Sequence, residues 1–332
     1  MFFISMFLAL TCGIFLSLQS PTNAALARRT DSLQAAAISF GTSTILLLPA
    51  ALLFGSGSLG AVIQADWWML FGGIYGGLFV LIITTAVPVL GTALTLTCSM
   101  LGQILMGILI DVLGLLCVTP IPLNLPRIGG CILVIVGIIL VYRASNQNDL
   151  QGRHFRSISS ARKIRLALLA LAAGMGSAIQ APTNTALAGI TGNIEASFFS
   201  FLGGVIFFAV ILILRRLGFA RRTAAGNSTA GYSEMDTASE TQTPKRRIRP
   251  WMLTGGVYGA SVVLFTIIAT PNLGVALVLG LSMIGQLAGG LTVDTLGLLQ
   301  AKRFPLVPRR LIGILLVTAG VILIAIGRIS AL

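Results

Sequence analysis

Charged residues are scarce in this chain. Asp, Glu, Lys and Arg make up 9% of its 332 residues, against about 25% in an ordinary soluble domain. Hydrophobic residues make up 56%, and the mean hydropathy is +0.97. This excludes a soluble globular protein. Apolar runs of about 20 residues, long enough to cross a bilayer as helices, lack the alternation of barrel strands, so we expect an all-α polytopic membrane protein.

The residues that most catalysis needs are also rare. The chain has nine acidic residues and one histidine, His154, which lies in a basic stretch. No Ser-His-Asp set, HExxH, P-loop or pair of catalytic carboxylates occurs, so we predict neither an enzyme nor an ATP-driven pump. The four cysteines lack metal-ligand or CxxC spacing. We therefore expect no metal and no cofactor.

The positive charge that is present does not indicate nucleic acid. A net charge of +13 would suggest a nucleic-acid partner in a soluble protein. Here the basic residues lie between the apolar runs, where they act as topology signals. The expected partners are a small-molecule solute and the lipid bilayer, and two copies of the chain could associate as a homodimer.

The two halves of the chain repeat each other. "QSPTN" at 19–23 returns as "QAPTN" at 180–184, an offset of 161 residues, and "SMLGQ" at 99–103 returns as "SMIGQ" at 282–286, an offset of 183. The difference of 22 residues places one insertion between 215 and 250.

Hydrophobicity and helix breakers predict ten transmembrane helices, five in each half. Because five is odd, the second half must cross the membrane in the opposite sense to the first, which makes the halves inverted repeats. The predicted spans are 2–27, 33–54, 67–87, 91–116, 127–143, 164–188, 194–214, 251–270, 274–299 and 310–327.

Basic residues orient these helices. Of the 22 Lys and Arg residues, 20 fall in alternate loops on one side, which the positive-inside rule makes the cytosolic side. Both termini are then outside. Arg28 and Arg29 follow the first "PTN", whereas Gly189 and Ile190 follow the second, as expected if the two copies face opposite sides. We expect a multi-pass protein of the inner (plasma) membrane.

This organisation divides the chain into three parts. The first repeat covers 1–143, a basic cytosolic linker covers 144–163, and the second repeat covers 164–332 with a disordered cytosolic loop at about 215–250. The apolar start at 2–27 resembles a signal peptide, but its terminal motif recurs in mid-chain, so we expect a retained first helix.

The repeated "PTN" turns are the first candidate site. Gln19 and Asn23 lie on one helical face, as do their counterparts Gln180 and Asn184. Pro21 and Pro182 are the corresponding helix-kink candidates, because proline removes a backbone hydrogen bond. The amides could simply join helices. Their occurrence once in each inverted repeat favours a lining of the substrate pathway.

A second candidate group lies in the fourth and ninth helices. Gln103 and Asp111 share one helical stripe, and Gln286 and Asp294 repeat it. The glutamines are further pathway candidates. The two aspartates are ionisable residues within apolar spans, so they are candidates for proton coupling or for a structural or gating hydrogen bond. The glycine patterns at 72–77 and 255–260 indicate close helix packing.

These motifs carry a family resemblance. The Q-x-P-T-N turns, the following "SF" at 39–40 and 200–201, and the GQ…D-x-x-G-L elements that start at 103 and 286 resemble the YdcZ-type family of inner-membrane exporters in the drug/metabolite transporter superfamily. The resemblance covers about 1–143 and 164–328, so the chain resembles a tandem fusion of two five-helix units.

The resemblance implies five plus five inverted helices around a central cavity, with efflux of a small solute by alternating access. The first helix lacks the membrane-embedded glutamate of the superfamily's small multidrug exporters, which argues against exchange of protons for cationic drugs. An amide-lined cavity favours a neutral or zwitterionic polar solute. A channel and a non-transporting membrane scaffold or regulator are the alternatives.

Overall fold

The computed structural model describes the chain except for residues 91, 150–159, 226–247, 301–307 and 331–332. Within the helices, some side chains also lie outside the description; that of Asp294 is one of them. The described residues form α-helices joined by short 3-10 helices and loops, and no strand occurs among them.

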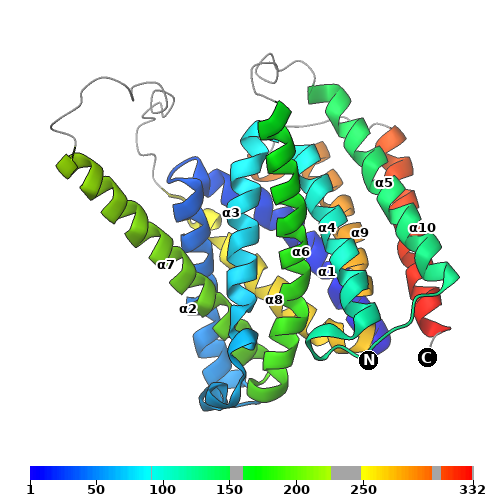
Figure 1. Cartoon of the computed structure of the whole chain (residues 1–332), viewed down its shortest axis with the longest axis horizontal. Helices are drawn as coiled ribbons and strands as arrows, with labels where there is room; N and C mark the ends of the chain where they lie inside the picture. Colours follow the sequence, from blue (N-terminus) through cyan, green and yellow to red (C-terminus); the bar gives the residue numbers. More distant parts are fainter. Residues whose placement is uncertain (91, 150–159, 226–247, 301–307, 331–332) are drawn as a thin grey trace.

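The described residues form ten α-helices in succession (Figure 1). Their bounds are α1 Phe2–Ala27, α2 Ser32–Phe54, α3 Gly72–Leu90, α4 Thr92–Leu113, α5 Leu125–Asp149, α6 Ser160–Thr191, α7 Asn193–Ala225, α8 Thr254–Leu273, α9 Val275–Leu296 and α10 Pro308–Ile329. The 3-10 helices are η1 Leu59–Gln64, η2 Trp67–Phe71, η3 Leu115–Cys117, η5 Pro250–Leu253 and η6 Leu298–Gln300.

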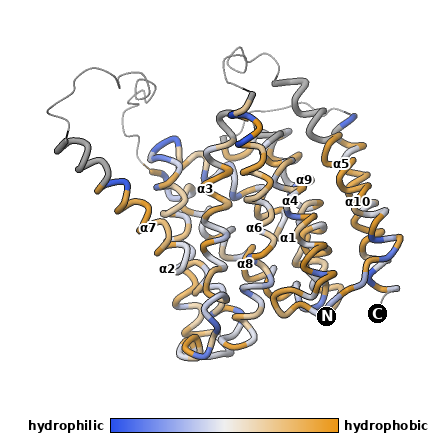
Figure 2. The backbone as a smooth tube through the Cα atoms, in the orientation of Figure 1, coloured by the Kyte–Doolittle hydropathy of each residue, from blue (hydrophilic) through white to orange (hydrophobic). Residues whose placement is uncertain are grey.

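Eight of these helices are long and apolar enough to cross a membrane, and two shorter apolar segments, Trp67–Ile83 and Leu125–Leu140, accompany them. Figure 2 shows apolar residues along the length of the helices and hydrophilic residues mainly near their ends. The predicted class of an all-α polytopic membrane protein is confirmed.

Several helix ends differ from the predicted spans. Two helices stop earlier than hydrophobicity suggests: α4 ends before Gly114 and α9 before Gly297, both of which have a left-handed backbone. Others continue past their apolar part into polar sequence. Thus α7 runs to Ala225, into the segment predicted as a disordered loop, while 226–247 lie outside the described residues.

The two halves are interleaved. Helix α1 packs against α8 and α9, and its counterpart α6 packs against α3 and α4. Helix α2 pairs with α7, and α5 pairs with α10 at one edge of the bundle (Figure 1). Each of these four pairings therefore has an equivalent in which the halves have exchanged roles, as in a two-fold symmetric interface.

Glycines permit the closest of these crossings. A Cβ on Gly102 of α4 would collide with the carbonyl oxygen of Leu171 in α6, and a Cβ on Gly285 of α9 would collide with that of Leu10 in α1. Both pairs match at the sequence offsets of 183 and 161. Close backbone approach through small residues is the usual way that membrane helices associate.

The "GL" element after each Asp-bearing helix also folds alike in both copies. Gly114 and Gly297 have φ of 64° and 66°, and Leu116 and Leu299 have φ of 56° and 54°. A left-handed leucine is strained, because its Cβ crowds the following carbonyl. The sharp reversal ends each helix abruptly and, in the first copy, brings Leu116 to the wall of a cavity.

Candidate solute site

The first polar turn lies against a glycine-rich helix of the other half. Helix α1 remains helical through Pro21, and its amides face α8. A Cβ on Gly255 would collide with Asn23 Oδ1, and a Cβ on Gly259 would lie 2.7 Å from Gln19 Nε2. Glycine at both positions lets these amides lie directly against α8.

The second polar turn makes the same contact. Helix α6 continues through Pro182. A Cβ on Gly72 of α3 would collide with Asn184 Oδ1, and a Cβ on Gly76 would lie 2.8 Å from Gln180 Oε1. The expected close packing of the glycine patterns thus occurs against the amides of the opposite repeat.

Several of these amide atoms have no hydrogen-bond partner among the described residues. The unpartnered atoms are Asn23 Oδ1 and both Oδ1 and Nδ2 of Asn184, which is 1% exposed. The neighbouring threonines differ, because the hydroxyls of Thr22 and Thr183 donate to carbonyls in their own helices. A buried amide without a partner carries a free-energy cost.

The glutamines of α4 and α9 lie beside the glycine crossings. Gln103 is half-buried, and its Nε2 donates to Ser99 Oγ over 3.4 Å. Gln286 is also half-buried, and a Cβ on Gly13 would lie 2.5 Å from its backbone nitrogen. The structure therefore places the pathway candidates at four separate helix crossings, α1–α8, α3–α6, α4–α6 and α1–α9.

Asp111 caps a helix of the other half. Its Oδ1 accepts the backbone N–H of Val275 at 2.7 Å and its Oδ2 that of Ala276 at 3.0 Å, both in the first turn of α9. Arg127 Nη2 donates to Oδ2 at 3.1 Å. Because a carboxylate is favourable at a helix N-terminus, these contacts favour a structural role over proton exchange. The side chain of Asp294 lies outside the described residues.

Arg127 completes this buried cluster. It is 2% exposed, and its Nη1 donates to the carbonyl oxygens of Ile121 at 2.6 Å and Pro122 at 3.1 Å. The cluster ties the α4–α5 link to the start of α9. Both charges of the ion pair are thus satisfied by further hydrogen bonds, as a buried pair requires.

A second arginine, Arg328 in the last turn of α10, lies beside this cluster. Its Nη2 donates to the carbonyl oxygen of Asn272 at 3.0 Å. A Cβ on Gly274 would lie 2.5 Å from Arg328 Nη1 and 3.1 Å from Asp111 Oδ1. Gly274 also has a left-handed φ of 72°, so the α8–α9 link requires glycine for its backbone and for this space.

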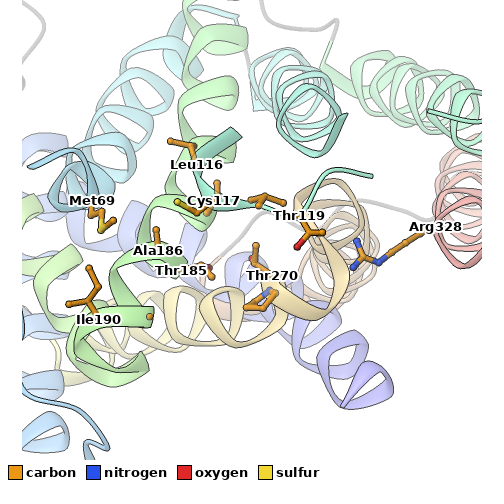
Figure 3. Close-up of a pocket in the computed structure, with 14 residues that line it drawn as sticks. Met69, Leu116, Cys117, Thr119, Thr185, Ala186, Ile190, Thr270 and Arg328 are labelled. Atoms are coloured by element: carbon orange, nitrogen blue, oxygen red, sulfur yellow. The ribbon is translucent and has the colours of Figure 1, made fainter. Parts of the chain in front are cut away.

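A cavity of about 380 Å³ opens beside Arg328 (Figure 3). Its walls come from the α4–α5 link, α6, the end of α8 and the end of α10, at the end of the bundle where both chain termini lie (Figure 1). The lining residues are Met69, Leu116, Cys117, Val118, Thr119, Pro182, Thr185, Ala186, Gly189, Ile190, Thr270, Pro271, Gly274 and Arg328. Cavities of this size hold small-molecule ligands.

Of the residues predicted as site residues, Pro182 lines this cavity. The six candidate amides are not in the lining, because the cavity follows the neighbouring face of α6 formed by 182, 185, 186 and 189. Among the described residues, no group of three His, Cys, Asp or Glu side chains could hold a metal ion.

Sequence reasoning missed three buried charged residues. Arg127 and Arg328 are the two basic residues that fall on the predicted outer side, a position that could have marked them as something other than topology signals. Glu195, at the start of α7, is 1% exposed and accepts the Gly57 N–H at 2.8 Å. Its presence at the edge of an apolar run was the available signal.

A comparison with known protein families matches the chain in two regions, one in each half. A family model described as "Putative inner membrane exporter, YdcZ" matches residues 4–140 and 165–323. No curated protein matches the chain. A solved structure described as "Crystal structure of protein" has a TM-score of 0.65 and 15% identity, and the match covers 98% of this chain and 97% of the other. At that identity the likeness concerns the fold.

Proposed function

Since the chain belongs to the YdcZ family of inner-membrane exporters, we propose that it is a secondary transporter that exports a small polar solute by alternating access. Membership makes it a multi-pass inner-membrane protein of a transporter family. The kind of solute and the mechanism are our proposal.

The observation that supports the mechanism is a difference between equivalent positions of the two repeats. Met69, which is 8% exposed, and the half-buried Ala186 line the cavity, whereas their counterparts Met252 and Ala25 pack together in a buried cluster, each 1% exposed. In inverted-repeat transporters, one conformation exposes the site to one side while the matching elements are packed on the other. With both termini outside, the cavity faces outward.

The buried amides fit the same scheme. Asn184 is closed off by α3, and Asn23 lies against α8, so a solute reaches them only when these helices separate. We propose that a passing solute then supplies the hydrogen bonds that the protein leaves unmade. Further contacts along the path would come from Gln19, Gln103, Gln180 and Gln286. Asp111 and Asp294 would stabilise the helices that move during gating.

Counterflow in liposomes tests the proposal. A thermal-shift screen of the purified protein first identifies a stabilising solute. Proteoliposomes loaded with that solute should then accumulate external tracer transiently and saturably, because a carrier exchanges solute across the membrane. A channel would give flux without this overshoot, and a scaffold would give no flux; either result would reject the proposal.

A double substitution separates transport from helix joining. Gln19→Ala with Gln180→Ala should lower the counterflow rate at least about tenfold, the effect of losing roughly one hydrogen bond to the solute, with a melting temperature close to that of the parent protein. The control pair is Gln34→Ala with Gln64→Ala, which removes two exposed amides. A fall in melting temperature with unchanged flux would assign the two amides to helix joining.

A further inference from the structure

The cavity has one charged side chain among its described lining residues, that of Arg328. The rest of the lining is apolar apart from Cys117 and the hydroxyls of three threonines. In Figure 3 the guanidinium of Arg328 extends from α10 toward the side of the cavity where Thr119 and Thr270 lie. The wall therefore combines an apolar surface with a single positive charge.

Arg328 is buried with part of its hydrogen-bonding capacity unused. The residue is 8% exposed, and its Nε and Nη1 have no partner among the described residues. Nε carries one N–H and Nη1 carries two, so three donors of a permanently charged group are unpaired. A buried charge in this condition is costly unless an anion compensates it.

The nearby carboxylate of Asp111 fills this role only in part. Asp111 already accepts hydrogen bonds from Arg127 and from two backbone amides of α9. One carboxylate therefore faces two guanidinium groups, and the described cluster keeps one positive charge in excess. That excess lies on the Arg328 side, at the cavity wall.

The two repeats differ in sequence at the position of Arg328. At the offset of 183 residues, the sequence counterpart of Arg328 is Ser145. The two repeats otherwise match closely in their glycine crossings and left-handed turns. The cavity wall thus carries a basic residue at a position where the other repeat has a serine.

We infer that the solute is a small organic anion with an apolar body, whose carboxylate binds Arg328. This rests on the proposed function, names its substrate class, and replaces the neutral or zwitterionic solute that the amides alone favour. Guanidinium groups bind carboxylates and phosphates through charge-assisted hydrogen bonds. Nε and Nη1 are covered in the present conformation, so the side chain turns toward the cavity to meet the anion, while the apolar wall accepts the rest of the solute.

Matched ligands test the charge requirement. Binding of benzoate and of butyrate to the purified protein is compared with binding of benzamide and butyramide, which keep the shape and lose the charge. Inorganic phosphate and vesicles containing an anionic phospholipid form two further arms, because a free phosphate or a lipid headgroup presents similar chemistry to an arginine.

Substitutions assign the binding to Arg328. Arg328→Gln should weaken carboxylate binding about 10- to 100-fold, the usual effect of losing a charged hydrogen-bond donor, and Arg328→Lys should restore part of it. Arg309→Gln is the matched control, since Arg309 is exposed at the opposite end of the same helix. Melting temperatures without ligand exclude misfolding, and Arg328→Lys keeps the test valid if Arg328→Gln does not fold.

Each result decides the inference. Carboxylate binding that depends on Arg328 supports it. Equal binding of the amides, no loss in Arg328→Gln, binding of none of the anions, or binding of phosphate or lipid alone overturns it. Counterflow of a neutral solute alongside any of those results would leave the proposed transporter standing, whereas absence of counterflow for every solute would reject the transporter itself.

Discussion

Asp111 illustrates how a single buried carboxylate is used in this protein. It belongs to the first repeat, yet it caps the N-terminus of α9 in the second repeat and pairs with Arg127. Its three partners come from two different elements, so loss of its charge would disturb the packing of both.

We predict that Asp111→Asn markedly destabilises the protein. The change leaves Arg127 buried without its counter-ion, and breaking a buried pair typically costs about 3–5 kcal/mol. The measurement is the melting temperature of the purified protein in detergent. Asp66→Asn, at an exposed aspartate, should be nearly neutral. Equal melting temperatures for the two variants would contradict the structural role of Asp111.

At the residue scale, the sequence predicted the polar turns but not what surrounds them. Recurrence of Gln19 and Asn23 at 180 and 184 identified them as a symmetric pair. Their contacts with glycines of the other half depend on which helices cross, and a repeat offset carries no such information. Arg127 and Arg328 were counted only as charges, because their burial arises from folding.

At the scale of elements, apolar length located all ten helices, while their ends depended on backbone conformation. The left-handed Gly114 and Gly297 stop α4 and α9 inside apolar sequence, where hydrophobicity alone predicts that a helix continues. The glycines at the crossings are a second property of elements, because each determines how near two helix axes come.

We predict that Gly102→Ala destabilises the bundle, because its Cβ would collide with the carbonyl oxygen of Leu171 and force α4 and α6 apart. Gly285→Ala should do the same for α1 and α9. Gly176→Ala is the control on α6: a Cβ there meets open space, and alanine favours helix by about 1 kcal/mol over glycine. Thermal unfolding of the three variants checks this, and a Gly102→Ala variant as stable as Gly176→Ala would refute the predicted collision.

At the scale of the whole molecule, the cavity and both termini share one end of the bundle (Figure 1). The distribution of basic residues predicts that this end is outside. A labelling experiment that uses native cysteines tests how the bundle is inserted in the membrane.

We predict that a membrane-impermeant maleimide added to intact cells labels Cys117 alone. Cys117 is exposed and lines the cavity, Cys12 is buried, and Cys98 and Cys131 are partly buried within apolar helices. Cys117→Ser should abolish the labelling. A cysteine introduced at Gly226, beyond the end of α7, should react only after the membrane is permeabilised. Labelling of that cysteine in intact cells would reverse the orientation.

The interleaving of the halves also determines the order in which helix contacts can form during biogenesis. Helix α1 leaves the ribosome first, but the helices against which it packs, α8 and α9, are among the last to be made. Until then its polar turn and Gly13 lack the partners in α8 and α9 against which they pack. The first half must therefore lie in the membrane with this contact surface uncovered until the second half is synthesised. A chain truncated after α7 should accordingly be degraded by membrane proteases rather than accumulate as a stable half-transporter.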